Sequence, residues 1–212
     1  MLKQEQDRLL KGLLNHLDSK TNVDAGGIMK APAKTYTSEE RFGTEWKSFF
    51  QDYPQIIGMS GDLAAPNSYL TIDDFGSPIL ATRDANGKFK AFANVCSHRG
   101  VQVEGAKKGV KSKFSCPFHG WTFDNNGSLV GYPKSEQFGK IDKDCYGLTE
   151  LPSVEKYGFL WVHPKAKGKI NLSELLGKKL EEEFKAWDFD RLILSNEAVS
   201  YTHLRAHETH SN

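Results

Sequence analysis

The feature that most constrains this chain is a pair of short motifs, each holding one cysteine and one histidine. The first is CSH, from Cys96 to His98, and the second is CPFH, from Cys116 to His119, with 17 residues between them. Thiolates and imidazoles are metal ligands. We expect each motif to lie at a hairpin tip, where its side chains can converge on one centre. The fold must therefore bring two loops together.

A disulfide, a catalytic thiol, a zinc site and an iron–sulfur cluster are the alternatives for these cysteines. Three cysteines in 212 residues make no disulfide framework. The chain opens MLKQEQDRLL without an apolar segment behind it, so we expect no secretory signal. The sequence contains no run of 18 apolar residues, so no membrane-spanning helix is expected. These observations favour a cytoplasmic protein in which the cysteines serve a metal or catalysis.

The order of the ligands separates zinc from iron and sulfur. Zinc fingers favour cysteine paired with cysteine and histidine with histidine. The mixed order here suits a cluster of two irons, in which each loop sends its cysteine to one iron and its histidine to the other. Tetrahedral zinc remains the alternative on spacing alone.

The two motifs and their neighbours resemble those of a known family. The pattern C-x-H-R-G…C-P-[FY]-H-G-W of ring-hydroxylating oxygenase α subunits, a Rieske motif, is matched by Cys96, His98, Arg99, Gly100, Cys116, Pro117, His119, Gly120 and Trp121. The resemblance extends roughly from Tyr36 to Asp190. It implies a Rieske [2Fe–2S] cluster held by Cys96, His98, Cys116 and His119, with other residues around these ligands, namely Arg99, Gly100, Gly120 and Trp121.

The residues around the ligands have expected roles. The two glycines would let the backbone turn close to the cluster. Trp121 would either shield one side of the cluster or serve as an ordinary core aromatic. Respiratory Rieske proteins carry an additional cysteine in each loop, which this sequence lacks. Cys145 is expected to be a plain thiol, and His16 and His163 to be structural.

Hydrophobic periodicity predicts a mostly β protein with flanking helices, an α+β fold. Residues 1–55 form a helical segment, 56–164 a small antiparallel Rieske domain, and 165–198 the start of a truncated catalytic domain. The expected strands are SYLTI, PILAT, KFKAFANV, WTF, SLVGY and GFLWVHP, with hairpin turns at 84–87 and 124–127. LSELLGKKLEEEFKAW predicts a later helix.

Two apolar stripes mark the N-terminal helices. The first is a row of leucines, either local core or a subunit contact: Leu9, Leu10, Leu13, Leu14 and Leu17. A second helix is expected to begin at a capping box formed by Thr37 and Glu40. Its stripe, interpreted as packing, consists of Phe42, Trp46, Phe49 and Phe50. A balance of 28 basic and 27 acidic residues argues against nucleic acid as a partner.

The resemblance implies a function. The chain would be the electron-transfer portion of an oxygenase α subunit, fed by a ferredoxin or flavin reductase, with a mononuclear Fe(II) in the intact protein only. A homotrimer or an α3β3 assembly would be its oligomeric form. Ring dihydroxylation is the leading expectation, with O-demethylation or quaternary-amine oxidation next. A stand-alone Rieske ferredoxin is the alternative, which the segments flanking the β domain disfavour.

The family's second motif, D/E-N-x-x-D-x-x-H-x4-H, would supply the ligands of the catalytic iron and is absent from this sequence. The tail offers a substitute in His203, His207 and Glu208, followed by His210. However, VSYTHLRAHET (199–209) looks like a translated sequencing adapter, so residues 199–212 are interpreted as a non-native tail. We therefore expect no catalytic residues in this chain.

Overall fold

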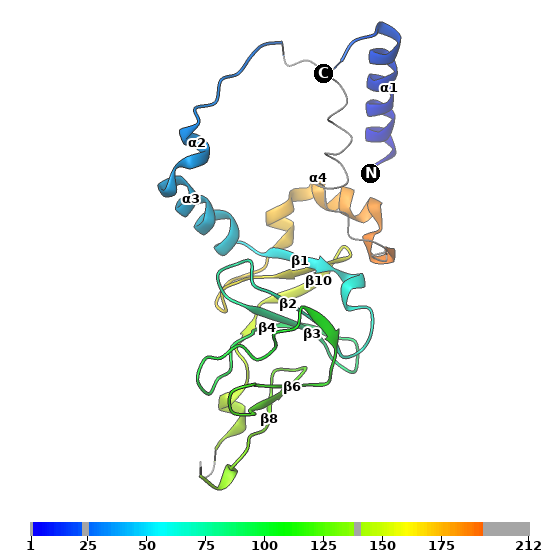
Figure 1. Ribbon diagram of the computed structural model, residues 1–212. Helices are drawn as coiled ribbons and strands as arrows, with labels where there is room; N and C mark the ends of the chain where they lie inside the picture. Colours follow the sequence, from blue (N-terminus) through cyan, green and yellow to red (C-terminus); the bar gives the residue numbers. More distant parts are fainter. Residues whose placement is uncertain (1, 23–25, 138–140, 193–212) are drawn as a thin grey trace.

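The computed structural model describes residues 2–22, 26–137 and 141–192. Figure 1 shows strands gathered in one body, with helices at one end and α1 (Lys3–Ser19) standing apart from the sheets. All strand pairs in the described part are antiparallel. The predicted fold class, mostly antiparallel β with flanking helices, is confirmed.

Three sheets make up the β body. The central sheet has the order β5-β2-β3-β4-β9, with strands Lys108–Val110, Ser68–Ile72, Ile79–Arg83, Phe89–Ala93 and Glu150–Leu151. A second sheet has the order β1-β11-β10, with strands Gln55–Met59, Phe159–Val162 and Ser153–Lys156. The third has the order β6-β7-β8, with strands Lys113–Ser115, Thr122–Asp124 and Leu129–Gly131.

The two predicted hairpin turns are confirmed and share one hydrogen-bond pattern. In the first, the Gly87 N–H donates to the Asp84 carbonyl at 3.0 Å, and Asp84 Oδ1 accepts from two further backbone N–H groups. Asp124 and Gly127 repeat the pattern at 124–127. Both glycines have positive φ, which residues with a Cβ adopt only at a cost.

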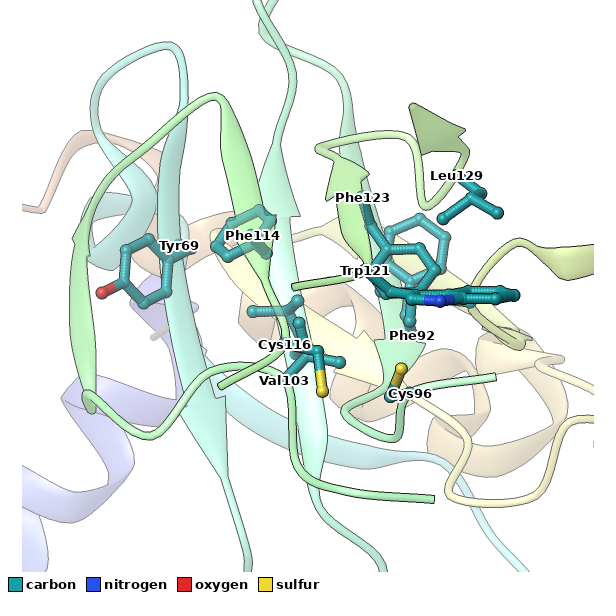
Figure 2. Close-up of a cluster of buried hydrophobic side chains, with 11 residues drawn as sticks. Tyr69, Phe92, Cys96, Val103, Phe114, Cys116, Trp121, Phe123 and Leu129 are labelled. Atoms are coloured by element: carbon teal, nitrogen blue, oxygen red, sulfur yellow. The ribbon is translucent and has the colours of Figure 1, made fainter. Parts of the chain in front are cut away.

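The central sheet is buried on both faces. Successive side chains of a strand point to opposite sides, so each strand contributes to two cores. One face contributes Leu80 and Phe92 to a core shared with the third sheet. The other face contributes Ile79 and Ala91 to a core shared with the second sheet. Figure 2 shows the first of these cores, which also contains both cysteines of the sequence motifs.

The second N-terminal helix begins at a different residue from the one predicted. The helix that follows α2 (Lys34–Thr37) is α3 (Glu39–Glu45), which continues into a π-helical segment, Trp46–Gln51. Its cap is Ser38, whose Oγ accepts from the Arg41 N–H at 3.3 Å. The capping box expected at Thr37 is therefore wrong by one residue, because Thr37 ends the preceding turn of helix.

The apolar stripes of these helices are exposed in the described chain. The five leucines of α1 are between 40% and 73% exposed, so they form no local core. Phe42 and Phe49 are 65% and 62% exposed, and their interpretation as packing residues is wrong within this chain. Trp46 lies against Phe42 and Phe50, with ring centroids 6.1 and 5.4 Å away, so the stripe is an aromatic row along one helical surface.

The predicted later helix is α4 (Leu172–Trp187), which is interrupted at Gly177, where φ is 66° and ψ is 165°. Asn171 caps its start by accepting from the Glu174 N–H. Phe184 holds the helix to β11 through Phe159, with ring centroids 5.5 Å apart. Short 3-10 turns complete the described elements: Ser60–Leu63, Ser135–Gln137, Lys143–Tyr146 and Phe189–Arg191.

Among the described residues, no helix combines the length and the apolar character that crossing a bilayer requires. Residues 193–198 and the tail at 199–212, with its three histidines, lie outside the described residues. The described chain therefore covers the expected β domain and most of the segment that follows it.

Candidate functional site

The first cysteine–histidine pair lies on a crossover rather than at a hairpin tip. β4 ends at Ala93, and the chain next pairs as β5, which contacts β2 and not β4. The segment with Cys96 and His98 thus spans the end of the sheet, and the hairpin expected here is wrong. Cys116 and His119 do lie on a hairpin, between β6 and β7. Sequence periodicity could not reveal which strands flank a loop in space.

The first loop is closed by its own backbone. The Gly100 N–H donates to the Cys96 carbonyl at 2.9 Å, and the Cys96 N–H donates to the Val101 carbonyl at 2.8 Å. Gly100 has a φ of 75°, which this tight return requires and which glycine adopts without strain. The backbone N–H groups of His98 and Arg99 hydrogen-bond to the Cys96 sulfur.

The second loop has the same backbone frame. The Gly120 N–H donates to the Cys116 carbonyl at 2.9 Å, and the Cys116 N–H donates to the Trp121 carbonyl at 2.8 Å. Gly120 has a φ of 69°. The two loops differ in where the histidine stands: His119 is three residues after its cysteine, whereas His98 is two residues after its own. Two matching frames thus present two thiols and two imidazoles.

At the loop ends these four side chains form two pairs, one of thiols and one of imidazoles. Cys96 and Cys116 are 3% and 4% exposed, form no disulfide, and act on each other as neighbouring thiols. The rings of His98 and His119 have centroids 4.9 Å apart. Figure 2 shows the Cys96 sulfur below the indole of Trp121 and the Cys116 sulfur to one side of it. The two thiols are therefore neighbours, and so are the two imidazoles, but in the described ranges no group of three His, Cys, Asp or Glu side chains is arranged to hold a metal ion.

The electrostatics of the site favour neutral side chains. Burial raises the pKa of the Cys96 thiol, and the adjacent Cys116 raises it further, against the opposing effect of the backbone N–H groups. Burial lowers the pKa of His98, as do the nearby His119 and Arg99. Neutral imidazole is the form that binds metals. The thiols would have to lose their protons on metal binding.

One atom tests whether the site fits a metal group. His119 Nδ1 is buried and has no hydrogen-bond partner. A buried polar atom without a partner is destabilising by about 1–3 kcal/mol, so folded proteins rarely keep one without a reason. A buried nitrogen without a partner, in a loop that also carries a buried thiol, fits a metal ligand. The donor set of two sulfurs and two nitrogens also fits a Rieske cluster.

The residues around these four side chains close the site on one side. Trp121 is 2% exposed and lies within 5.6 Å, centroid to centroid, of both Tyr132 and Tyr146. Ser97 Oγ donates to the Tyr146 carbonyl at 2.6 Å, which ties the first loop to the turn Lys143–Tyr146. Arg99 is exposed and acts on His98 only through its charge.

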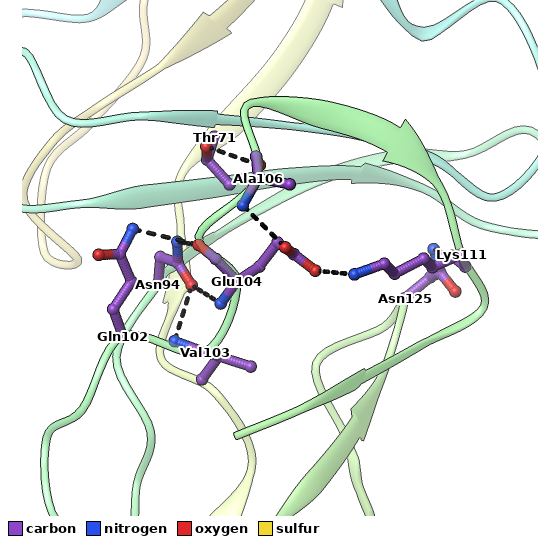
Figure 3. Close-up of polar contacts among 8 residues, drawn as sticks. All are labelled: Thr71, Asn94, Gln102, Val103, Glu104, Ala106, Lys111 and Asn125. Carbon is purple, nitrogen blue, oxygen red and sulfur yellow. Dashed lines mark hydrogen bonds and ion pairs between the residues drawn. The ribbon is translucent and has the colours of Figure 1, made fainter. Parts of the chain in front are cut away.

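A buried polar network behind the loops was not anticipated from the sequence. Asn94 is fully buried and bonds to the backbone of residues 103 and 104, and the Glu104 carboxylate pairs with Lys111. Figure 3 shows these contacts in one view. One sequence signal was available: Asn94 interrupts the apolar run AFANVC, and an amide in such a run must find partners.

The other residues that the sequence singled out lie away from this site. His163 is 4% exposed, and its ring contacts the Asp52 carbonyl at 3.3 Å and the Lys165 N–H at 3.1 Å, as expected of a structural residue. His16 Nδ1 lies 3.0 Å from Thr21 Oγ1. Cys145 is an exposed thiol.

Comparison with known proteins places the site in a family. Residues 54–155 match the Rieske [2Fe-2S] domain. The α subunit of toluate 1,2-dioxygenase from Pseudomonas putida is 32% identical over 154 residues, which cover 70% of this chain and 34% of the relative. The oxygenase subunit of carnitine monooxygenase from Escherichia coli (strain K12) is 30% identical, over 71% of this chain and 41% of the relative.

Solved structures agree. Naphthalene 1,2-dioxygenase with indole bound in its active site is similar with a TM-score of 0.60 and 28% identity, over 67% of this chain and 32% of that one. The apo form of a quaternary ammonium Rieske monooxygenase gives a TM-score of 0.66 and 27% identity, over 76% and 47%. The chain spans about a third to a half of the length of these relatives. It therefore contains a segment that matches the Rieske [2Fe–2S] domain, and it is similar to part of the α subunits of Rieske dioxygenases and monooxygenases.

Proposed function

We propose that Cys96, His98, Cys116 and His119 are the ligands of a [2Fe–2S] cluster through which this domain accepts and passes on single electrons. The observation that carries the proposal is the buried His119 Nδ1, which lacks a hydrogen-bond partner and lies in the loop that also carries the buried thiol of Cys116. When bound, the cluster supplies reversible one-electron transfer. We assign Nδ1 as the ligating atom of His119.

The surrounding residues support this role. The two thiols release their protons as they bind, and the N–H groups of His98 and Arg99 that point at the Cys96 sulfur stabilise the negative charge left there. Trp121 covers the buried side of the site and excludes water from it. The His98 ring is only partly buried, so its second nitrogen can exchange a proton with solvent.

The proposal extends to the protein of which this domain is part. We propose an oxygenase α subunit with residues 1–55 as a helical segment, 56–164 as the electron-transfer domain and 165–198 as the start of a catalytic domain that holds a mononuclear Fe(II). A ferredoxin or flavin reductase would deliver electrons, and a homotrimer or α3β3 assembly would be the oligomer. Because the thiols must stay reduced until metal binds, we place the protein in the cytoplasm.

Two substrate classes remain in competition. Aromatic ring dihydroxylation follows from the dioxygenase relatives, which include the toluate enzyme. Quaternary-amine monooxygenation is the second candidate, because the quaternary ammonium monooxygenase structure has the higher TM-score and this chain covers more of it, 47% against 32%. The flanking helical segments disfavour a stand-alone Rieske ferredoxin, which would be little more than the β domain.

Reconstitution tests the cluster. The purified chain, supplied with iron and sulfide, should bind about two irons and two sulfides and become red-brown. Cys96→Ser and His119→Ala should each abolish this binding. Cys145→Ser and His163→Gln are the matched controls, because they alter the same residue types outside the site and should leave the iron content unchanged. Binding of a single zinc without sulfide would contradict the proposal.

A further inference from the structure

Asn94 ties together the two ends of the segment that carries the first ligand pair. Its Oδ1 accepts from the Val103 N–H at 3.2 Å and the Glu104 N–H at 3.0 Å, and its Nδ2 donates to the Glu104 carbonyl at 2.7 Å. The side chain is fully buried. Cys96 and His98 lie between these anchoring points. A single amide thus fixes where the first loop leaves the sheet and where it returns.

Glu104 and Lys111 continue the network toward the second loop. The Glu104 carboxylate accepts from the Ala106 N–H at 2.9 Å and from Lys111 Nζ. The carbonyl of Lys111 accepts from Asn125 Nδ2 at 2.9 Å. Asn125 belongs to the turn between β7 and β8, on the sheet whose other hairpin carries Cys116 and His119. Lys111 therefore links Glu104, where the first ligand loop returns, to the third sheet at the end of β7 that lies opposite the second ligand loop.

The network is also fixed to the central sheet. Thr82 Oγ1, on β3, donates to the Asn125 carbonyl at 2.8 Å, and Thr71 Oγ1, on β2, donates to the Ala106 carbonyl at 3.1 Å. Figure 3 shows the chain of contacts running from Asn94 through Glu104 to Lys111. None of these three side chains hydrogen-bonds to a candidate ligand side chain in the contacts described. Apart from the electrostatic effect of their charges, any effect that they have on the ligands must pass through the loop backbones.

We propose that Asn94, Glu104 and Lys111 are positioning residues that set the separation of the two ligand loops and so tune the bound cluster. This inference rests on the proposed function for the cluster itself. Ligand geometry is one of the means by which a protein adjusts a metal centre, and outer residues fix that geometry. Buried hydrogen bonds that are fully satisfied hold it rigidly, because losing one partner leaves another group buried and unpaired.

Two charge-changing variants separate positioning from direct electrostatics. Glu104→Gln removes a negative charge and Lys111→Met removes a positive one, but each breaks the same ion pair. If the link positions the loops, both variants should change the g-values of the reduced cluster in the same direction, and the double variant should resemble either single one. Lys111→Arg should preserve the wild-type spectrum, because a guanidinium can still donate to Glu104.

The matched control is Glu150→Gln, on the edge strand β9 of the central sheet. Glu150 also faces a lysine, Lys90, at 3.5 Å, but it lies at the exposed edge and takes no part in the network. Its variant should keep the wild-type g-values and midpoint potential. Network variants with a wild-type spectrum would overturn the inference. So would opposite shifts in midpoint potential for Glu104→Gln and Lys111→Met that cancel in the double variant, since that pattern indicates charge alone.

A metal-free measurement keeps this test separate from the proposed function. Amide hydrogen exchange reports the Gly100 and Gly120 N–H groups, which close the two ligand loops. We expect Asn94→Ala, Glu104→Gln and Lys111→Met to accelerate exchange at these amides roughly tenfold, which is about 1.4 kcal/mol of local opening. Glu150→Gln should not.

Iron and sulfide binding tests the proposed function, and amide exchange tests the positioning network. If the wild-type chain binds no iron and sulfide, the proposed function is wrong, and the exchange data alone decide whether the network holds the loops. Unchanged exchange at Gly100 and Gly120 in the Glu104→Gln and Lys111→Met variants overturns the inference whatever the chain binds. If Asn94→Ala does not fold, these two milder variants still provide the answer.

Discussion

The imidazole of His98 lies flat against the indole of Trp121, with ring centroids 4.8 Å apart and planes inclined by only 4°. His98 belongs to the first loop, and Trp121 directly follows the second. The stack is therefore a contact between the loops as well as a restraint on the imidazole plane. A ligand whose ring orientation is fixed before metal arrives loses less entropy on binding.

The first prediction concerns this stack. Trp121→Ala should lower the free energy of unfolding by about 3–5 kcal/mol, the usual result for removing a buried aromatic side chain. Trp187→Ala is the control, since Trp187 is 50% exposed and should lose at most about 1–2 kcal/mol. Urea unfolding of the metal-free chains measures both. Equal losses of unfolding free energy in the two variants would contradict the prediction.

The two DxNG turns provide a second, internally controlled prediction. Gly87 and Gly127 have φ values of 82° and 78°, so alanine is strained at both. A Cβ at position 87 meets nothing within 4 Å, whereas one at position 127 overlaps the ring of Phe92. Gly87→Ala should therefore be destabilising by about 1–2 kcal/mol from backbone strain alone. Gly127→Ala should add a further 1–3 kcal/mol or so of overpacking.

Thermal unfolding of the two glycine variants checks this difference. Because the backbone strain is common to both, subtracting one result from the other isolates the contact with Phe92. Pairing Gly127→Ala with Phe92→Leu should recover part of the loss, since the smaller side chain leaves room for the new Cβ. Equal destabilisation by the two alanine variants would contradict the prediction.

A third prediction concerns acid stability. Burial alone would raise the pKa of Glu155, but its hydrogen bonds with Arg83, at 2.8 and 2.9 Å, leave that pKa below the ordinary value of 4.5. A carboxyl whose pKa is lower in the folded state adds stability above its unfolded pKa. That stability is lost as pH falls through the folded pKa.

Glu155→Gln should thus be less stable than wild type by about 1–2 kcal/mol at pH 7, and the difference should shrink below pH 4.5. Glu45→Gln is the control, because its pair with Arg41 is exposed and should contribute less than about 0.5 kcal/mol. Denaturant titrations at several pH values measure the gap. A gap that stays constant from pH 7 to pH 3 would refute the linkage.

The fourth prediction concerns the tail. Deleting residues 199–212 should leave iron and sulfide content, melting temperature and electron acceptance unchanged, because the sequence there resembles an adapter rather than a metal motif. The bound cluster should accept electrons from an added reductant. No oxygenated aromatic product should form when Fe(II) is added. Product formation that disappears with His203→Ala or His207→Ala would contradict both expectations.

Local sequence patterns predicted both hairpin turns and six of the eleven described strands, but they missed β1, β5, β6, β9 and β10. SYLTI is β2 without change, and the DANG and DNNG turns form where the Asp, Asn and Gly residues indicate. Such features depend on side-chain alternation and on residues that tolerate positive φ, which the sequence states directly. The interruption of α4 at Gly177 was not predicted, because an isolated glycine in a helical pattern is usually tolerated.

Long-range relationships could not be predicted in this way. The motif identified the four candidate ligands, but nothing in it states that β5 pairs with β2, or that Asn94 reaches Glu104. Exposure is the clearest case. Phe42 and Leu13 have the periodicity of packed residues, yet both are 65% exposed in this chain. Periodicity reports that a helix has an apolar side, not what covers it.

The crossover from β4 to β5 also has a kinetic consequence. The hairpin with Cys116 and His119 joins neighbours in sequence, and such hairpins form in about 1–10 μs. The loop with Cys96 and His98 can close locally, but it takes its place at the end of the sheet only after β5 has docked on β2, and such distant pairings form more slowly. During folding, one half of the site is therefore ready first. An iron atom that arrives early meets Cys116 and His119 before the other two ligands are in place.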